Sequence, residues 1–521
     1  MNSSVQCKCP VDLYSSSDGY ISWINILPPC TYAASTDRNT SGASLPNIIF
    51  ILADDLGYGD VQYNGGDAVT SNLNAMASGP HSIKFTRFYS GGPVCSPTRG
   101  TLLTGRNHNR YCIWRANTAG KTCNNTSDFN CAAKMPLPTS EITVAEILKN
   151  AGYRTATFGK WHLGDLKPLP GGSSRWPSSH PGQHGFDVWK VTERSVPTAN
   201  PNCACFNTSL CVLGHSARKG PPSCTNYHAG TGSDMNTLVT HDEPIIGDDS
   251  HFIVDEFASF LNSTVSNTDT PFFAYISLHT VHKVYVAIPP YSTLYTSQRY
   301  SQKEVDYYGA ITAMDKAIGK IRELLGYHNL TNNTMLWFTS DNGPENNTPG
   351  QTAGLKGRKG SLYEGGIRVP GILEWPAVIP RNRVSNFPVV TSDFLPTICD
   401  ILGTQPPKDR QIDGISILPH IQGNMEYRTK PITWAFNKKG DFRKKYSTAI
   451  SDNRYKAHIE YKNGKVRSSH LYDLLIDSAE SRDLSSQHPA VLRRLTQVMD
   501  AWTTSLINSA RNEVSCLATP V

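Results

Sequence analysis

Four short apolar runs constrain the fold more than any other feature of this 521-residue chain. They occupy Asn47–Asp55, Tyr153–His162, Pro271–His282 and Thr334–Gly343. Each run is short, mostly apolar and ends in polar residues, which is typical of a strand mostly buried on both faces. Because helical patterns separate the runs, the sequence predicts an α/β fold with a mostly parallel central sheet flanked by helices.

Two stretches carry the helical pattern between these strands. The stretch 143–152 opens with a capping-box pair, Thr143 and Glu146. The stretch 303–326 repeats apolar residues at helical spacing. Ligands of such sheets bind beyond the carboxyl ends of the strands, so we expect the four polar ends to converge on one crevice.

The last hundred residues have a different pattern. Short runs of strand character follow one another, and Asn463-Gly464 is a strong hairpin turn. An amphipathic helix containing Leu495, Met499 and Trp502 closes the chain. We therefore expect a cysteine-containing extension over 1–45, a main α/β domain over 46–415, and a smaller α+β domain with an antiparallel sheet over 416–521.

The charge of the chain is weakly basic. The formal net charge is +6, and Lys and Arg form neither a block nor a stripe interleaved with aromatic residues. The longest aliphatic run, Asn47–Ala53, is much shorter than a membrane-spanning helix. The sequence therefore argues against a nucleic-acid partner and a transmembrane segment.

Cysteine usage points to an oxidising compartment. Most of the 13 cysteines lie in polar stretches rich in Pro, Gly and Asn, and setting Cys95 aside leaves an even number. Zinc is the alternative, but Cys203–Cys211 lacks a clear tetrahedral ligand spacing. Glycosylation triplets begin at Asn39, Asn124, Asn125, Asn207, Asn262, Asn329, Asn332 and Asn346. We expect a disulfide-bonded glycoprotein of the secretory pathway, secreted or in a lysosome-like compartment, although the chain shows no signal peptide.

The segment CSPTRGTLLTGR, Cys95–Arg106, places a thiol beside a predicted helix. Ser96 is a good N-cap and Pro97 suits the first helical position, so Cys95 is expected just outside the helix. Free N–H groups at that end favour an anion, and Arg99 adds a positive charge. This arrangement suits a nucleophile that faces an anionic substrate, or a thiolate.

The polar strand ends offer ligands and proton carriers. Asp54-Asp55 and Asp341-Asn342 are hard oxygen donors, which favour Ca²⁺ or Mg²⁺, although either pair alone is also typical of a solvated turn. The other candidates are two lysines, Lys160 and Lys359, and three histidines, His162, His279 and His282. In isolation, the two lysines are also compatible with ordinary surface residues, and the three histidines with structural ones.

The ordered set of motifs resembles the type I sulfatases, arylsulfatase-like and formylglycine-dependent enzymes of the alkaline-phosphatase-like superfamily. The resemblance covers Pro46–Glu374 and rests on NIIFILADDLGYGD, CSPTRGTLLTGR, GKWHLG, HTVH, SDNG and KGSLYEGGIRVP. It implies that a formylglycine-generating enzyme oxidises Cys95 to Cα-formylglycine (3-oxoalanine). One hydroxyl of the hydrated aldehyde would then attack the sulfur of a sulfate ester.

The resemblance also implies a metal site and a division of roles. Residue 95 and the side chains of Asp54, Asp55, Asp341 and Asn342 would bind Ca²⁺, with Mg²⁺ as the alternative. Arg99 would stabilise the deprotonated diol, while Lys160 and Lys359 would neutralise sulfate oxygens. His279 would protonate the leaving group, and His162 would take a proton from the second hydroxyl. His282 and, by spacing alone, Ser195 would contact the substrate.

One departure from the family pattern affects the histidines, because Val281 stands where H-x-P-H has proline. The leading hypothesis is a sulfuric ester hydrolase acting on a small sulfate ester or a sulfated glycan. The alternatives are a phosphonate monoester or phosphodiester hydrolase of the same superfamily, and an inactive disulfide-rich secreted binding protein whose Cys95 joins a disulfide.

Overall fold

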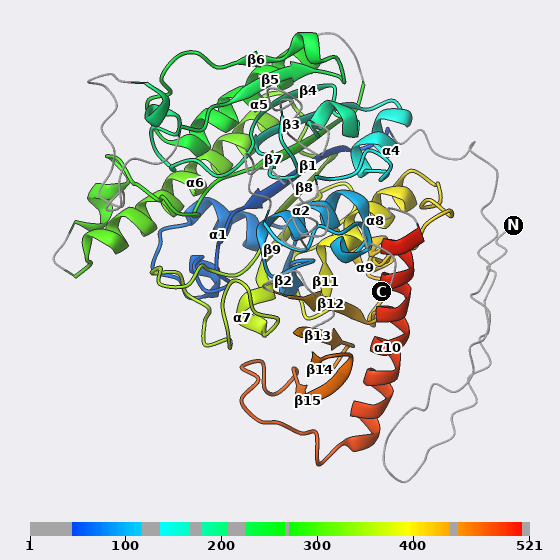
Figure 1. Cartoon of the computed structure of the whole chain (residues 1–521). Helices are drawn as coiled ribbons and strands as arrows, with labels where there is room; N and C mark the ends of the chain where they lie inside the picture. Colours follow the sequence, from blue (N-terminus) through cyan, green and yellow to red (C-terminus); the bar gives the residue numbers. More distant parts are fainter. Residues whose placement is uncertain are drawn as a thin grey trace, which may run out of the picture. The chain divides into compact units, whose positions relative to one another are not determined.

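The computed structural model describes residues 44–116, 136–166, 179–206, 224–265, 270–296, 299–437 and 445–512. Of residues 511 and 512 it describes the backbone only. Leu45–Val521 forms one compact unit (Figure 1). The expected extension over 1–45 lies almost entirely outside the described residues, as do the glycosylation triplets at Asn39, Asn124, Asn125 and Asn207.

The main sheet is 11-stranded and is built around a parallel block in the order β8-β1-β7-β3-β4. Its strands are β1 (Asn47–Ala53), β3 (Arg154–Lys160), β4 (Val188–Thr192), β7 (Phe272–Ser277) and β8 (Thr334–Ser340). Four of the five are the strands predicted from the apolar runs, and they are neighbours. The expectation of a mostly parallel central sheet is confirmed.

Both edges of this block are extended by shorter or antiparallel strands. Next to β8 lie β9 (Arg368–Glu374), β2 (Ser82–Tyr89), β10 (Arg383–Ser385) and β11 (Val389–Val390). Next to β4 lie β5 (His228–Thr231) and β6 (Val239–Thr240). The pairs β8–β9, β9–β2, β4–β5 and β5–β6 are antiparallel, so the complete sheet is mixed.

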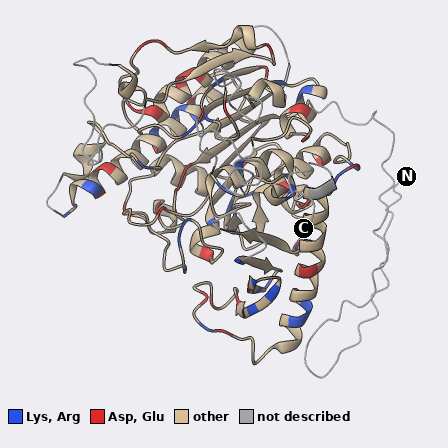
Figure 2. Cartoon of the chain, viewed as in Figure 1, with Lys and Arg blue, Asp and Glu red and all other residues tan. Residues whose placement is uncertain are grey.

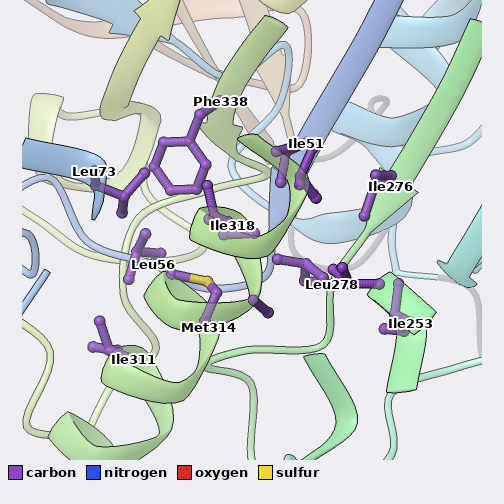
Figure 3. Packing of buried hydrophobic residues seen from close by; sticks show 14 of the residues in the cluster. Ile51, Leu56, Leu73, Ile253, Ile276, Leu278, Ile311, Met314, Ile318 and Phe338 are labelled. Carbon is purple, nitrogen blue, oxygen red and sulfur yellow. The ribbon is translucent and has the colours of Figure 1, made fainter. Parts of the chain in front are cut away.

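Helices cover both faces of the sheet, which explains why its strands are apolar throughout. One face carries α1 (Ser71–Ser78), α5 (Asp249–Val265) and α6 (Gln302–Tyr327), and the other carries α2 (Cys95–Thr104), α4 (Val144–Asn150) and α8 (Phe394–Ile401). Along β1, Ile49 and Ile51 enter the first core, while Ile48 and Phe50 enter the second. Figure 3 shows the first core, where Ile318 of α6 lies near Phe338 and Ile51.

The ends of the predicted helices follow from local capping. Thr143 accepts a hydrogen bond from the backbone N–H of Glu146, and the Glu146 side chain accepts one from Thr143 N–H. The predicted capping box at the start of α4 is therefore confirmed. Two further helices are single turns, α7 (Glu364–Ile367) and α9 (Leu418–Ile421).

The C-terminal region forms a second, four-stranded antiparallel sheet in chain order: β12 (Ile432–Phe436), β13 (Lys445–Ser451), β14 (Tyr455–Lys462) and β15 (Lys465–Asp473). Asn463 and Gly464 both have left-handed backbones, as a two-residue hairpin requires. The closing helix α10 (Pro489–Asn512) lies beside this sheet (Figure 1). Its residues Leu495, Met499 and Trp502 are buried in a core that they share with strands of the sheet. The predicted antiparallel sheet and closing helix are confirmed, while the boundary at 415 stays a prediction.

Charged residues are interspersed along the described chain, and Lys and Arg do not gather on one element (Figure 2). Among the described residues, every helix is too short or too polar to cross a membrane.

Candidate active site

The carboxyl ends of β1, β3, β7 and β8 meet at one edge of the main sheet, and the predicted side chains follow them directly. Asp54 and Asp55 follow β1, Lys160 ends β3, and Asp341 and Asn342 follow β8. All five are at most 1% exposed. Burial of so many polar groups requires mutual hydrogen bonding or a bound ion.

The carboxylates form an acidic cluster that fits a hard cation. One ligand atom from each of Asp54, Asp55, Cys95 and Asp341 lies within 4.8 Å of the others. Asn342 Nδ2 donates to Asp55 Oδ1 at 2.7 Å, whereas buried Asn342 Oδ1 has no hydrogen-bond partner among the described residues. Converging carboxylates beside an unsatisfied amide oxygen are the donor set that Ca²⁺ and Mg²⁺ prefer.

Cys95 lies inside the first turn of α2 rather than before it, which corrects the expected helix start. The N-cap is Val94, because Ser96 Oγ donates to the carbonyl oxygen of His162 at 2.7 Å instead of capping the helix. Cys95 Sγ lies 3.4 Å from Asp54 Oδ1 and is not in a disulfide. Burial and then the charge of Asp341 raise the pKa of the thiol well above its usual value, so the unmodified side chain is a neutral thiol and not a thiolate.

Three cations balance the carboxylates. Lys160 Nζ lies 2.5 Å from Asp54 Oδ2, and Lys359 Nζ lies 2.7 Å from both oxygens of Asp55. Arg99 Nη2 lies 2.8 Å from Asp341 Oδ2. Burial alone would raise the pKa of Asp54, but Lys160 and the other nearby cations outweigh it and hold the pKa well below its usual value.

Arg99 also joins the strand ends. Its Nη1 donates to the carbonyl oxygen of Lys160 at 3.2 Å and to the hydroxyl of Ser277, the last residue of β7. Ser195, which was selected by spacing alone, reaches the acidic cluster as well, and its Oγ donates to Asp54 Oδ2 at 3.1 Å.

The two histidines of HTVH occupy different environments. A ring nitrogen of His282 lies within 4.8 Å of Asp54 and Cys95, its Nε2 lies 3.9 Å from Asp55 Oδ2, and its side chain is 24% exposed. His279 is fully buried, with Nδ1 2.7 Å from Asp249 Oδ2 and Nε2 2.7 Å from Thr192 Oγ1. Within the described part of the chain, His279 makes no hydrogen bond or ion pair with the acidic cluster.

The structure does not bring His279 to the acidic cluster, where we expected it to protonate the leaving group, and that role stays a prediction. Both of its ring nitrogens are occupied inside the protein, whereas His282 faces the cluster. Asp249, whose other oxygen accepts from Tyr227 OH at 2.5 Å, and Thr192 were missed by the sequence reasoning. Neither residue belongs to a motif, and no local pattern links them to His279.

His162 follows Lys160 after β3 and is 7% exposed. Its backbone is left-handed, with φ 55°, and its carbonyl accepts the Ser96 hydrogen bond described above. The structure therefore joins the segment of His162 to the first turn of α2, where Cys95 lies.

Three features together define the class of enzyme to which this protein belongs. They are the acidic, metal-compatible cluster at the carboxyl edge of a parallel sheet, the cysteine in C-x-P-x-R, and the flanking lysines. The chain belongs to the sulfatase family, because the family model Sulfatase matches residues 46–404. A second model, N-sulphoglucosamine sulphohydrolase, C-terminal, matches residues 358–504. The protein is thus a type I sulfatase of the alkaline-phosphatase-like superfamily, a hydrolase of sulfate esters, and members of this family use a metal ion.

The chain is also similar to individual sulfatases over most of its length. The chain is 30% identical to N-acetylgalactosamine-6-sulfatase of Mus musculus over 424 residues, covering 80% of this chain and 72% of the relative. It is 30% identical to steryl-sulfatase of Homo sapiens over 442 residues, covering 75% and 72%. The crystal structure of Ps i-CgsB in complex with k-i-k-neocarrahexaose superposes with a TM-score of 0.71 and 25% identity, covering 89% of this chain and 93% of that one.

Proposed function

We propose that this sulfatase hydrolyses the sulfate ester of a sugar, with residue 95 converted to Cα-formylglycine. The observation that carries the proposal is the position of Cys95. It is buried and free of a disulfide, and its Sγ lies 3.4 Å from Asp54 Oδ1 in the acidic cluster. Because Cys95 is free of a disulfide, the structure also argues against the inactive binding protein in which this cysteine would be bridged.

The metal is proposed to be Ca²⁺, with Mg²⁺ as the alternative, held by Asp54, Asp55, Asp341 and Asn342. The free Oδ1 of Asn342 and the converging carboxylates support this assignment. When bound, the cation would act as a Lewis acid toward the sulfate group and the nucleophile.

Charge balance explains how the crevice would accept an anionic ester. Three aspartates are offset by Lys160, Lys359 and Arg99, so a divalent cation would make the cluster net positive. Lys160 and Lys359 would exchange part of their contact with the aspartates for sulfate oxygens. Arg99 would keep the strand ends together and stabilise the deprotonated nucleophile, and Ser195 would donate to the sulfate.

His282 is proposed as the residue that protonates the leaving oxygen, in place of His279. It lies beside the cluster, is partly exposed, and therefore can exchange protons with water and substrate. His162 is retained as the residue that would accept a proton from the second hydroxyl of residue 95. His279 would instead support Thr192, three residues before Ser195.

Two similar proteins support a sugar substrate. One relative is an N-acetylgalactosamine-6-sulfatase, and the similar solved structure contains a neocarrahexaose. Passage through the secretory pathway is supported by the disulfide Cys205–Cys224 and by exposed acceptor residues, namely Asn262, Asn329, Asn332 and Asn346. A formylglycine-generating enzyme would be the maturation partner.

The proposal is tested on protein made in a host that contains a formylglycine-generating enzyme. The peptide that carries residue 95 should be lighter than its cysteine form and should react with a hydrazide. The protein should cleave sulfated N-acetylgalactosamine faster than a matched aryl phosphonate ester. An intact cysteine in active protein would refute the modification, and a preference for the phosphonate would favour the alternative hydrolase.

A further inference from the structure

The segment Lys356–Glu364, here called the Lys359 loop, carries Lys359 to the acidic cluster between β8 and α7. Its backbone is attached to two parts of the site. Lys359 N donates to Pro344 O at 3.1 Å, beyond β8, and Gly360 N donates to Pro93 O at 2.8 Å, just before α2. These bonds position the middle of the loop but leave its two ends to be held elsewhere.

Both ends of the Lys359 loop meet one residue of the C-terminal region, Glu480. At the far end, Glu364 N donates to Glu480 Oε2 at 2.6 Å, and at the near end, Lys356 Nζ donates to Glu480 O at 3.4 Å. Gly365 N also donates to Lys356 O at 2.8 Å, which closes the loop on itself. Glu480 thus contacts both ends of a loop whose ends are also joined by a backbone hydrogen bond.

The side chains that pair around Glu480 are charged and buried. Lys456 Nζ of β14 lies 2.9 Å from Glu364 Oε1 and 3.0 Å from Glu480 Oε1, and all three side chains are fully buried. Tyr89 OH of β2 donates to the remaining oxygen of Glu364 at 3.0 Å. Removing Lys456 would leave two buried carboxylates without their cation, whereas removing Glu480 would leave the Lys456–Glu364 pair in place and free the N–H of Glu364.

The backbone of Glu480 adds an independent observation. Its φ is 54°, in the left-handed region that glycine adopts far more readily than glutamate. A glutamate in this conformation loses backbone freedom that its side chain must compensate. Two contacts compensate for it: the Glu480 carboxylate accepts the hydrogen bond from the N–H of Glu364, and it forms the ion pair with Lys456.

We infer that Glu480, in the connection between β15 and α10, is a positioning residue for Lys359 and acts through both ends of the Lys359 loop. The inference rests on the proposed role of Lys359 at the sulfate. A displacement of the loop ends would move the Lys359 ammonium away from Asp55, where it lies 2.7 Å from the carboxylate oxygens. Displacements of about 1 Å in such groups cost on the order of a hundredfold in rate.

The test is a double-mutant cycle of Glu480→Ala and Lys359→Ala in the full-length, formylglycine-containing enzyme. We expect Glu480→Ala to lower kcat/KM for para-nitrophenyl sulfate about 10- to 100-fold. In the Lys359→Ala background, Glu480→Ala should change kcat/KM less than about twofold, because the ammonium that Glu480 positions is absent. The same cycle is read on the Kd of inorganic sulfate by calorimetry, which needs no turnover.

The matched control is Asp393→Ala. Asp393 is also a buried carboxylate paired with a cation from the C-terminal region, Arg428 at 2.6 Å. We expect its effect on kcat/KM and on sulfate affinity to be the same with and without Lys359. If Glu480→Ala does not fold, Lys356→Met replaces it, since Lys356 is exposed and the change removes the near-end bond together with the contacts of the ammonium with the rings of Tyr363 and Tyr472.

The outcomes separate the two claims. Equal effects of Glu480→Ala in both backgrounds would overturn the positioning role while leaving Lys359 as a sulfate-binding residue. If Lys359→Ala itself leaves both kcat/KM and sulfate affinity unchanged, the proposed role of Lys359 fails, and the positioning role fails with it.

Discussion

Two buried ion clusters of this sulfatase differ in how their carboxylates are arranged. In the C-terminal cluster, Lys456 Nζ contacts the carboxylates of both Glu364 and Glu480, at 2.9 and 3.0 Å, although Glu480 Oε1 makes this ion pair without a hydrogen bond. In the acidic cluster at the sheet edge, four ligand atoms converge while Asn342 Oδ1 has no hydrogen-bond partner among the described residues. Burial of charge and an oxygen atom without a hydrogen bond are thus common to both, and what marks the functional site is the convergence of four ligand atoms within 4.8 Å of one another.

The largest expected effect concerns residue 95. Cys95→Ala should lower kcat/KM by about 10⁵-fold, as removal of a catalytic nucleophile does. The melting temperature should change little, because the only hydrogen bond of the thiol to another described residue is the one to Asp54. The rate is measured with para-nitrophenyl sulfate and folding by thermal unfolding.

Cys399→Ala is the matched control, since Cys399 of α8 is also buried and free of a disulfide. We expect it to retain turnover and to lose stability by cavity formation. Equal turnover of the two variants would contradict the assigned nucleophile.

The second prediction compares the metal affinity of the two clusters. Chelator-treated protein should be inactive and should regain activity with Ca²⁺ or Mg²⁺. Asn342→Ala should weaken Ca²⁺ binding at least about tenfold in calorimetry, because it removes the free oxygen beside the carboxylates. Glu480→Gln, in the C-terminal cluster, should leave the Ca²⁺ affinity unchanged, and an equal loss in both variants would show that the acidic cluster is not the metal site.

The third prediction separates the two histidines by the basicity of the leaving group. His282→Ala should slow poor leaving groups by about 10²- to 10⁴-fold and good phenols far less, because only poor ones need protonation. His279→Ala should lower the rates of all substrates by a similar factor and lower the melting temperature, since Asp249 and Thr192 lose their partner. The measurement is kcat/KM against leaving-group pKa, and a steep dependence for His279→Ala alone would restore the original assignment.

Sequence alone predicted the parts of the site that follow directly from strand ends. Asp54, Asp55, Asp341 and Asn342 come within two residues of β1 or β8, so a correct strand assignment places them at one edge. The histidines lie beyond Ser277, the last residue of β7, where the two-residue alternation of a strand no longer tells which side chain faces the site. Only the tertiary contacts of His279 with Asp249 and Thr192 decide this.

Other misses have the same origin in long-range contacts. Ser96 has the local features of an N-cap, but its hydroxyl donates to the carbonyl oxygen of His162, 66 residues away, and the helix begins two residues earlier than expected. Glu480 bonds to Glu364 across 116 residues and lies in no motif. The folded chain chooses these partners by proximity, which local patterns do not encode.

The smallest expected effect is a difference in stability between two buried lysines, Lys160 and Lys456. Both are fully buried and paired with carboxylates, so replacing either with Met leaves buried negative charge and should cost about 3–5 kcal/mol in metal-free protein. Saturating Ca²⁺ should restore part of the loss in Lys160→Met, because a cation beside Asp54 replaces the missing positive charge and ligand binding stabilises the folded state. Lys456→Met should show no such extra recovery, since Glu364 and Glu480 lie outside the acidic cluster. The free energy of unfolding, measured by urea titration with and without Ca²⁺, gives both values, and equal recovery in the two variants would mean that the clusters do not differ in their need for a metal.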